Sequence, residues 1–340
     1  MFFMAGNANA KMKLLVLADI FKRYSDEEHI LNSGAIIELL QQAGITAERK
    51  SLYSDIAILR AYGMDIISTT SPRKGYFLGG RAFEPAEVRL LSDAVQAADF
   101  ISAAKTRSLV EKIGGFVSIY QEKKIKEQVY IDARPKCSNE EIYYSIDALD
   151  TAIKAGRQVS LQYARRVLGE RFTARRESRD FVLSPYALIW SNDHYYLIAN
   201  NAKYDNLMHL RIDRIHSVEV LEEDARPFYQ VSPYHSYFNV ADYAGKVFNM
   251  FTGTTDVVEL DCDAAILEQI LDRFGENVNL RRGEREDSFK VRFSATVTDG
   301  LVSYIMQFGE HARVVFPENL RDMVHEKAIK ICALYTNAAE

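Results

Sequence analysis

Apolar positions in the first eighty residues recur with the three- and four-residue spacing of amphipathic helices. The first two stripes are Leu14, Leu17, Ala18 and Phe21, and then Ile36, Leu39, Leu40 and Ala43. After a turn at Gly44, a third stripe predicts a helix that Thr46 caps and that continues through Arg60. Residues 65–68 and 75–78 read as strands around a turn at residues 69–74. Three short helices followed by a β-hairpin are typical of a winged helix-turn-helix.

The pattern after residue 82 changes from helices to alternating strands. A helix begun by Pro85 is predicted from the stripe Leu91, Ala94, Val95 and Ala98, and a partner helix at about residues 106–113. Alternation predicts strands at residues 159–163, 181–190 and 194–199. Farther on, predicted strands at 256–262, 288–295 and 312–316 alternate with predicted helices at 264–274, 299–308 and 317–335. This alternation predicts a C-terminal α+β sandwich in a multidomain α+β chain.

Composition narrows the class of protein. The chain has 340 residues, of which 48% are hydrophobic and 26% charged, which is typical of a soluble globular protein and excludes disorder on a large scale. No run approaches the roughly 18 apolar residues of a membrane span, and the first ten residues lack the charged start of an export signal. We therefore expect a cytoplasmic protein without a membrane partner. The scattered Cys137, Cys262 and Cys332 are expected to be buried reduced thiols, without disulfide or zinc.

Charge is distributed unevenly along the chain. The net charge of −5 argues at first against nucleic-acid binding. Counted by region, however, residues 1–81 carry +2, 82–150 carry −3, 151–221 carry +4 and 222–340 carry −8. The distribution excludes a protein that binds nucleic acid non-specifically along its whole surface, but it allows a local surface that recognises nucleic acid.

The predicted third helix and hairpin tip carry the candidate DNA-binding residues. Their side chains reach base edges or phosphates from a recognition helix and a wing: Arg49, Lys50, Ser51, Tyr53, Ser54, Arg73 and Lys74. Because Glu48 and Asp55 reduce the positive field, one copy is expected to bind DNA weakly, and a dimer is expected. The alternative is a three-helix module that binds another protein.

Three regions of the sequence resemble the WYL-domain transcriptional regulators. Residues 49–56 and 74–78 are similar to the third helix and wing of that family. The resemblance is sharper in residues 181–190, with their embedded Pro185, and in residues 194–199, where Tyr195 replaces the family's Trp. Residues 209–215 match the closing Arg-Leu-Asp-Arg-Ile motif with one change, at Ile212. The C-terminal part resembles the extension that follows the barrel, at Gly309, Val314, Pro317 and Leu320.

This resemblance implies a domain organisation and a homodimer. The expected parts are a winged helix-turn-helix DNA-binding domain (1–81), a helical linker for dimerisation (82–150), a ligand-sensing Sm-like small β-barrel, the WYL domain (151–226), a connector (227–254) and a C-terminal extension of α+β type (255–340). It also implies that the ligand of the barrel controls binding of a double-stranded DNA operator.

The candidate ligand-binding residues are aromatics that can stack on a base and arginines that can fork onto phosphates: Tyr163, His194, Tyr196, Arg211 and Arg214. An anionic ligand fits them, either a nucleotide or single-stranded nucleic acid. Alternation places Arg211 on the face opposite Leu210 and Ile212, whereas Arg214 has to leave the strand or snorkel. The alternatives are core tyrosines and simple ion pairs to Asp213.

A basic run between two predicted strands allows two interpretations. Its members are Arg165, Arg166, Arg171, Arg175, Arg176 and Arg179. The run is either a phosphate-contacting lobe beside the barrel or a solvated hairpin or loop that favours solubility.

No motif in the sequence assembles a catalytic site. There is no glycine-rich phosphate loop, nucleophile elbow or histidine pair at metal spacing, and Asp261 and Asp263 are expected to be solvated at a strand end. We expect no enzyme, cofactor or metal. Two hypotheses remain: a ligand-responsive transcriptional regulator, and a nucleic-acid-sensing interaction protein whose winged helix binds a protein partner.

Overall fold

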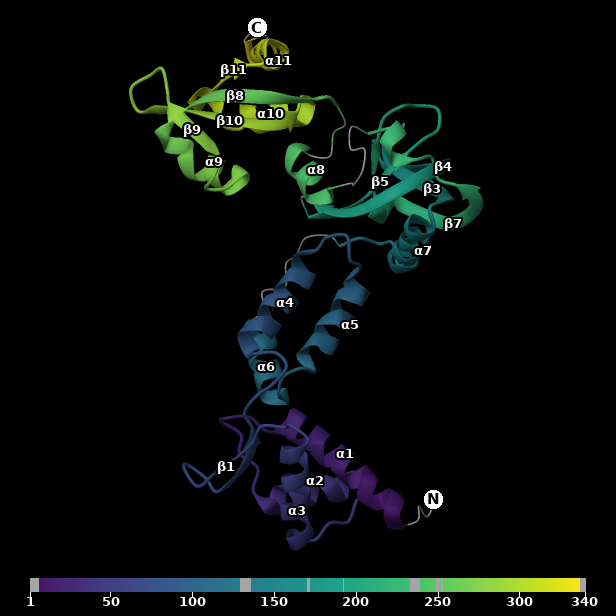
Figure 1. Ribbon diagram of the computed structural model, residues 1–340, viewed down its shortest axis with the longest axis vertical. Helices are drawn as coiled ribbons and strands as arrows, with labels where there is room; N and C mark the ends of the chain where they lie inside the picture. Colours follow the sequence, from purple (N-terminus) through teal and green to yellow (C-terminus); the bar gives the residue numbers. More distant parts are fainter. Residues whose placement is uncertain are drawn as a thin grey trace. The chain divides into compact units, whose positions relative to one another are not determined.

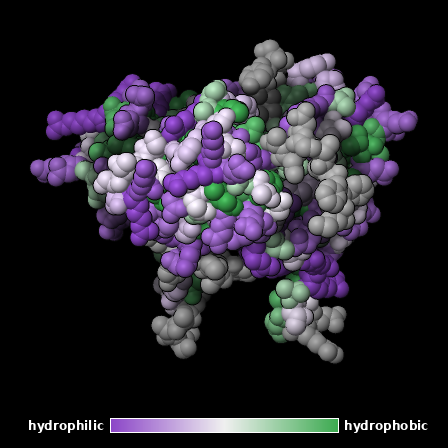
Figure 2. Space-filling model, turned by 90° about the horizontal axis from the view of Figure 1, so that it is seen from below, coloured by the Kyte–Doolittle hydropathy of each residue, from purple (hydrophilic) through white to green (hydrophobic). Residues whose placement is uncertain are grey.

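The computed structural model describes residues 6–128, 136–169, 172–191, 193–232, 239–248, 251 and 253–336. The chain is a mixed α/β multidomain protein that divides into two compact units, Met1–Ser138 and Asn139–Glu340. Viewed from below relative to Figure 1, its surface shows mainly hydrophilic side chains with small groups of hydrophobic ones (Figure 2).

The first unit begins with three helices and a two-stranded antiparallel sheet (Figure 1). The elements are α1 (Gly6–Tyr24), α2 (Ser33–Gln42), α3 (Arg49–Ala61), β1 (Ile66–Thr69) and β2 (Gly75–Leu78). Leu17, Phe21 and Leu52 are among the completely buried side chains that join the helices. The predicted cap of α3 is wrong: Glu48, not Thr46, holds the N-cap position, and its side chain makes no capping bond.

Three further helices complete the first unit: α4 (Pro85–Ala97), α5 (Ala103–Gly114) and α6 (Ile119–Gln128). α4 packs against both α5 and α6. Its buried residues are Val88 and Ser92, whereas Leu91 is 39% exposed and Ala94 is also exposed. The predicted apolar stripe was therefore wrong in part, because the helix buries the neighbouring face, including a serine that donates to the Val88 carbonyl.

The second unit contains a five-stranded antiparallel sheet in the order β6-β5-β4-β3-β7. Its strands are β3 (Arg157–Leu168), β4 (Ala174–Ser191), β5 (His194–Asn200), β6 (Met208–Arg211) and β7 (Ile215–Asp224), and α7 (Ile142–Ala155) packs on it. A bulge interrupts the β4–β5 pairing between Pro185 and Ala187. Among the described residues β6 and β7 are the two edges and do not pair with each other, so the expected closed barrel is not confirmed.

The last part of the second unit is a four-stranded sheet with helices. After α8 (Val240–Lys246) come β8 (Thr255–Asp263), α9 (Leu267–Phe274), β9 (Asn279–Arg282), β10 (Ser288–Thr296), α10 (Asp299–Met306), β11 (Ala312–Phe316) and α11 (Glu318–Thr336). The strand order is β11-β8-β10-β9, and Leu260, Val291 and Leu301 lie in its core. The predicted alternation of strands and helices is confirmed here.

Burial tests the expectations for Asp261 and for the three cysteines. Asp261, expected to be solvated, is completely buried and pairs with Arg285 and Arg313. Cys262 is buried as expected, but Cys137 is half-buried and Cys332 is exposed. No helix within the described residues has the length and apolar character needed to cross a membrane.

Candidate nucleic-acid and ligand sites

One face of α3 is turned to solvent and carries most of the candidate DNA-binding residues. Leu52, Ile56 and Leu59 anchor the opposite face in the core. The exposed candidates on α3 are Arg49, Lys50, Tyr53 and Ser54. Ser51 is half-buried, where it donates to the Glu48 carbonyl (2.9 Å) and accepts from Lys13 (3.3 Å). Ser51 is therefore held by structural bonds and is the weakest of the helix candidates.

A hollow of about 530 Å³ lies between the start of α2, the exposed face of α3 and the β1–β2 turn. Its lining includes Ser33, Arg49, Tyr53, Thr70 and Lys74. Arg49 Nε donates to the Tyr53 hydroxyl at 3.2 Å. Hydrogen bonding with Ser33, and then with Arg49, lowers the pKa of Tyr53. The structure thus brings three of the candidates together, while Arg73 is exposed in the turn.

All five ligand candidates gather around Tyr196 of β5. Tyr196 is the cross-strand partner of Arg211, and its ring lies 6.2 Å from that of His194. Burial raises the pKa of Tyr196, while the positive charges of Arg211 and Arg214 act in the opposite direction. Tyr163 on β3 is also close enough to contribute to that pKa. The sequence-based grouping of these side chains therefore corresponds to one place in the structure.

The geometry also supports parts of the alternative interpretation. Tyr196 is only 9% exposed and belongs to a hydrophobic cluster. Arg211 forks onto Asp213, with Nε–Oδ1 and Nη2–Oδ2 distances of 3.0 and 2.8 Å. This ion pair fixes one edge of the Arg211 guanidinium. Arg214 lies in a 3-10 turn, Ile212–Arg214, and so leaves the strand as its position in the pattern required.

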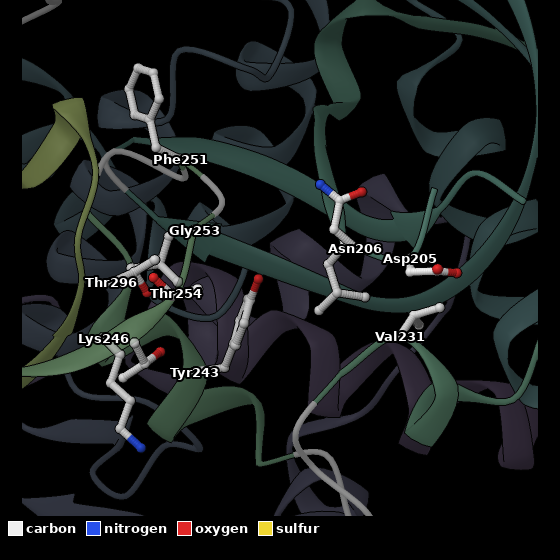
Figure 3. Close-up of a pocket in the computed structure, with 12 residues that line it drawn as sticks. Asp205, Asn206, Val231, Tyr243, Lys246, Phe251, Gly253, Thr254 and Thr296 are labelled. Atoms are coloured by element: carbon white, nitrogen blue, oxygen red, sulfur yellow. The ribbon is translucent and has the colours of Figure 1, made fainter. Parts of the chain in front are cut away.

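A cavity that sequence reasoning missed lies between the WYL-like sheet and the last part of the chain. Its volume is about 820 Å³, and its lining includes Asn206, Val231, Tyr243, Lys246 and Thr254. Tyr243 lies between Thr254 and Val231, and the Lys246 ammonium turns away from it (Figure 3). Burial raises the pKa of Tyr243 to about 12, and its hydroxyl lies 2.8 Å from His209 Nε2. The segment around α8 carries no motif, and its sequence predicts only a connector.

Comparison with protein families assigns two of these regions. The WYL domain profile matches residues 145–220, and the WCX domain profile matches residues 254–331. The chain contains a WYL domain and a WCX domain. The five ligand candidates all fall within the WYL domain, whereas the α3 surface precedes both matches.

Solved structures give weaker similarities. Proteasome accessory factor B/C (PafBC) of Arthrobacter aurescens is 18% identical with a TM-score of 0.25; the match covers 92% of this chain and 47% of that one. The chain thus spans about half the length of that protein. A CRISPR Cas-related protein is 12% identical with a TM-score of 0.38, covering 100% of this chain and 89% of that one. No curated protein matches the sequence.

Proposed function

We propose that the protein is a ligand-responsive DNA-binding transcriptional regulator. The observation that carries the proposal is a WYL domain that follows, in one chain, a unit of three helices and a hairpin with an exposed, polar third helix. That order of elements fits a winged helix-turn-helix. The WYL sheet, with five antiparallel strands and bulges in two of its pairings, fits an Sm-like sensor domain.

In the proposed complex with DNA, α3 enters the major groove and the β1–β2 turn contacts the backbone. The hollow beside α3 suits a phosphate, because Arg49 and Lys74 line it together with the N-terminal turn of α2. Lys50 and Ser54 on the exposed helix face are placed to read base edges or adjacent phosphates. The DNA-binding part carries only +2, so tight binding requires a homodimer on a two-fold operator.

The proposed ligand is a nucleotide or a single-stranded nucleic acid held by the WYL domain. Arg211 presents its second guanidinium edge while Asp213 fixes the first, and Tyr163 and His194 offer half-exposed rings for stacking. Binding shifts the population of DNA-competent dimers. The protein has no catalytic role in this proposal and needs no cofactor or metal.

One observation favours the second candidate function, in which the winged helix binds a protein. Ile58 and Tyr62, at the end of α3, are 48% and 85% exposed. Large apolar side chains on a solvent-facing helix suit a protein partner. In that case the WYL domain senses nucleic acid without specific DNA binding by α3.

A mobility-shift assay separates the two functions. The probe is the DNA upstream of the protein's own gene, tested at about 50 mM salt with and without added nucleotide. We expect a sequence-dependent shift that Lys50→Ala weakens and Lys330→Ala, an exposed lysine of α11, leaves unchanged. Absence of any shift under these conditions rejects the regulator and favours the protein-binding alternative.

A further inference from the structure

The β3–β4 hairpin extends beyond the rest of its sheet. β7 pairs with β3 only as far as Tyr163, whereas β4 continues to pair with β3 up to Leu168 and Ala174. Residues 164–168 and 174–178 therefore form a two-stranded extension, without a third paired strand among the described residues. We call this extension the ribbon. The basic run of the sequence lies on it, except Arg179, which follows it on β4, and Arg171, which is outside the described residues.

The ribbon concentrates positive charge on exposed side chains. Arg165, Arg166, Arg175 and Arg176 are all exposed, and Glu177 is the one acid among the described ribbon residues. Arg166 and Arg176 are direct cross-strand partners. The ribbon therefore carries an excess of exposed positive charge, which suits an anionic partner.

One face of the ribbon continues the ligand site of the WYL domain. Direct partners in an antiparallel pair share a face, and on this face the successive pairs are Tyr163–Arg179, Arg165–Glu177 and Val167–Arg175. Tyr163 is also close to Tyr196 and Arg211. Arg165 is oriented by Glu177 through bonds of 3.0 and 2.8 Å. Arginines therefore follow one another from the ligand site toward the ribbon tip.

The ribbon tip carries apolar side chains in solvent. Leu168 is 71% exposed and Phe172 is 87% exposed. An exposed aromatic ring can stack on an unpaired base, and such stacking is independent of sequence. Arginines beside an exposed ring are the combination found in sites for single-stranded nucleic acid.

We propose that the ribbon binds the phosphates of a single-stranded nucleic acid whose first bases occupy the ligand site. This inference rests on the proposed nucleic-acid ligand of the WYL domain and makes that ligand an oligonucleotide, not a mononucleotide. The distance along the strand from residue 163 to residue 167 is roughly 13 Å. At about 3.4 Å of axis per phosphate in a stacked strand, this length spans about four phosphates.

The test compares two fluorescent oligothymidylates, one of three and one of twelve nucleotides. The affinity of the full chain for each is measured by anisotropy titration. We expect the twelve-residue oligonucleotide to bind more tightly, because only it reaches the ribbon. The variant Arg165→Ala/Arg175→Ala should weaken its binding about ten-fold at 50 mM salt and lower the slope of log K against log salt by about 1.4. Binding of the three-residue oligonucleotide should be unchanged.

A matched control is Arg281→Ala/Arg282→Ala, which removes two exposed arginines from β9. It should change neither affinity nor slope, and circular dichroism should show that both double variants are folded. Equal affinities of the two oligonucleotides, or no effect of the ribbon variant, overturn the inference. Equal ribbon-dependent binding of a twelve-base-pair duplex overturns the single-strand assignment. A ribbon variant that changes only the oligomeric state identifies the ribbon as a subunit contact and overturns it too.

An incorrect assignment of the ligand site would give a different pattern of affinities from an incorrect assignment of the ribbon. Arg211→Ala should weaken both oligonucleotides if the ligand site of the proposed function is correct. If Arg211→Ala has no effect while the ribbon variant weakens the longer oligonucleotide, the ribbon stands and the ligand-site assignment fails. If Arg211→Ala weakens binding of the shorter oligonucleotide and the ribbon variant changes the binding of neither, the proposed ligand site stands and the ribbon inference fails.

Discussion

Asp26 shows how a single buried carboxylate joins two parts of the first unit. It is almost completely buried after α1, and it accepts hydrogen bonds from the Ser118 hydroxyl (2.5 Å), from His29 Nδ1 (2.7 Å) and from the His29 backbone (2.8 Å). Ser118 also accepts from the Gln121 backbone at the start of α6, and the Tyr120 ring stacks on His29. The helical linker is thus fixed to the segment that precedes α2.

We predict that Asp26→Asn destabilises the protein in a pH-dependent way. Burial alone raises the pKa of Asp26, but the bonds from Ser118 and His29 outweigh it, so the pKa is lowered from 3.8. A lowered pKa in the folded state stabilises the protein above the unfolded pKa, and this stabilisation is lost as pH falls through the folded pKa. Urea unfolding should show a loss of about 1–3 kcal/mol at pH 7 that shrinks toward pH 3.

Asp93→Asn is the control for this measurement. Asp93 is half-exposed on α4 and pairs with Arg89 at 3.8 Å, a surface pair whose removal should cost less than about 1 kcal/mol. A penalty for Asp26→Asn that stays constant from pH 7 to pH 3 would contradict the role assigned to the ionised carboxylate.

The limits of sequence reasoning are clearest at Asp261. Asp261 and Asp263 are two residues apart on β8 and so share a face, but the alternation of side chains does not predict how deeply either is buried. Asp261 is completely buried because Arg285 and Arg313, from the segment after β9 and from β11, close over it. Those partners are distant in the sequence, so only the folded chain brings them together. The grouping of the ligand candidates was easier to predict, because family motifs marked most of them.

Elements with a strong period were predictable, and weakly patterned ones were not. β11 occupies the predicted residues 312–316, and α10 and α11 begin at or next to their predicted starts. α6 was missed because its sequence is mainly polar and its packing depends on contacts with α1 and α4. β9 was missed because all four of its residues are exposed on an edge strand. These two elements therefore depend on contacts with distant parts of the chain and not on a local sequence pattern.

The hollow beside α3 gives a prediction at the level of the element. Arg49→Ala should weaken operator binding by a similar factor on related sequences and lower the salt slope by about 0.9, because it removes one phosphate contact. Fluorescence anisotropy over a series of salt concentrations measures both effects. Arg107→Ala, an exposed arginine of α5, is the control. A change in sequence preference without a change in slope would show that Arg49 contacts a base instead.

For the whole molecule, the net charge of −5 is the sum of basic and acidic regions of the chain. Residues 222–340 carry −8, whereas residues 151–221 carry +4 and residues 1–81 carry +2. Because salt screens exposed charges beyond roughly 8–10 Å, the field at each surface depends on the charges near it and not on the net charge of the chain. The two basic regions are separated in the sequence by a helical segment of −3, so the proposed DNA-binding and ligand-binding surfaces lie in different parts of the chain.

Any thermodynamic coupling between the two proposed binding surfaces must be equal in both directions. If the twelve-residue oligothymidylate changes operator affinity by some factor, the operator must change oligothymidylate affinity by the same factor, typically about 5–150-fold. Both factors can be measured by anisotropy with one labelled ligand at a time. Arg211→Ala should leave operator affinity unchanged without oligonucleotide but abolish its response to oligonucleotide. Because the ligand acts only through its different affinity for two states, a full response in the Arg211 variant would show that the oligonucleotide acts at another site.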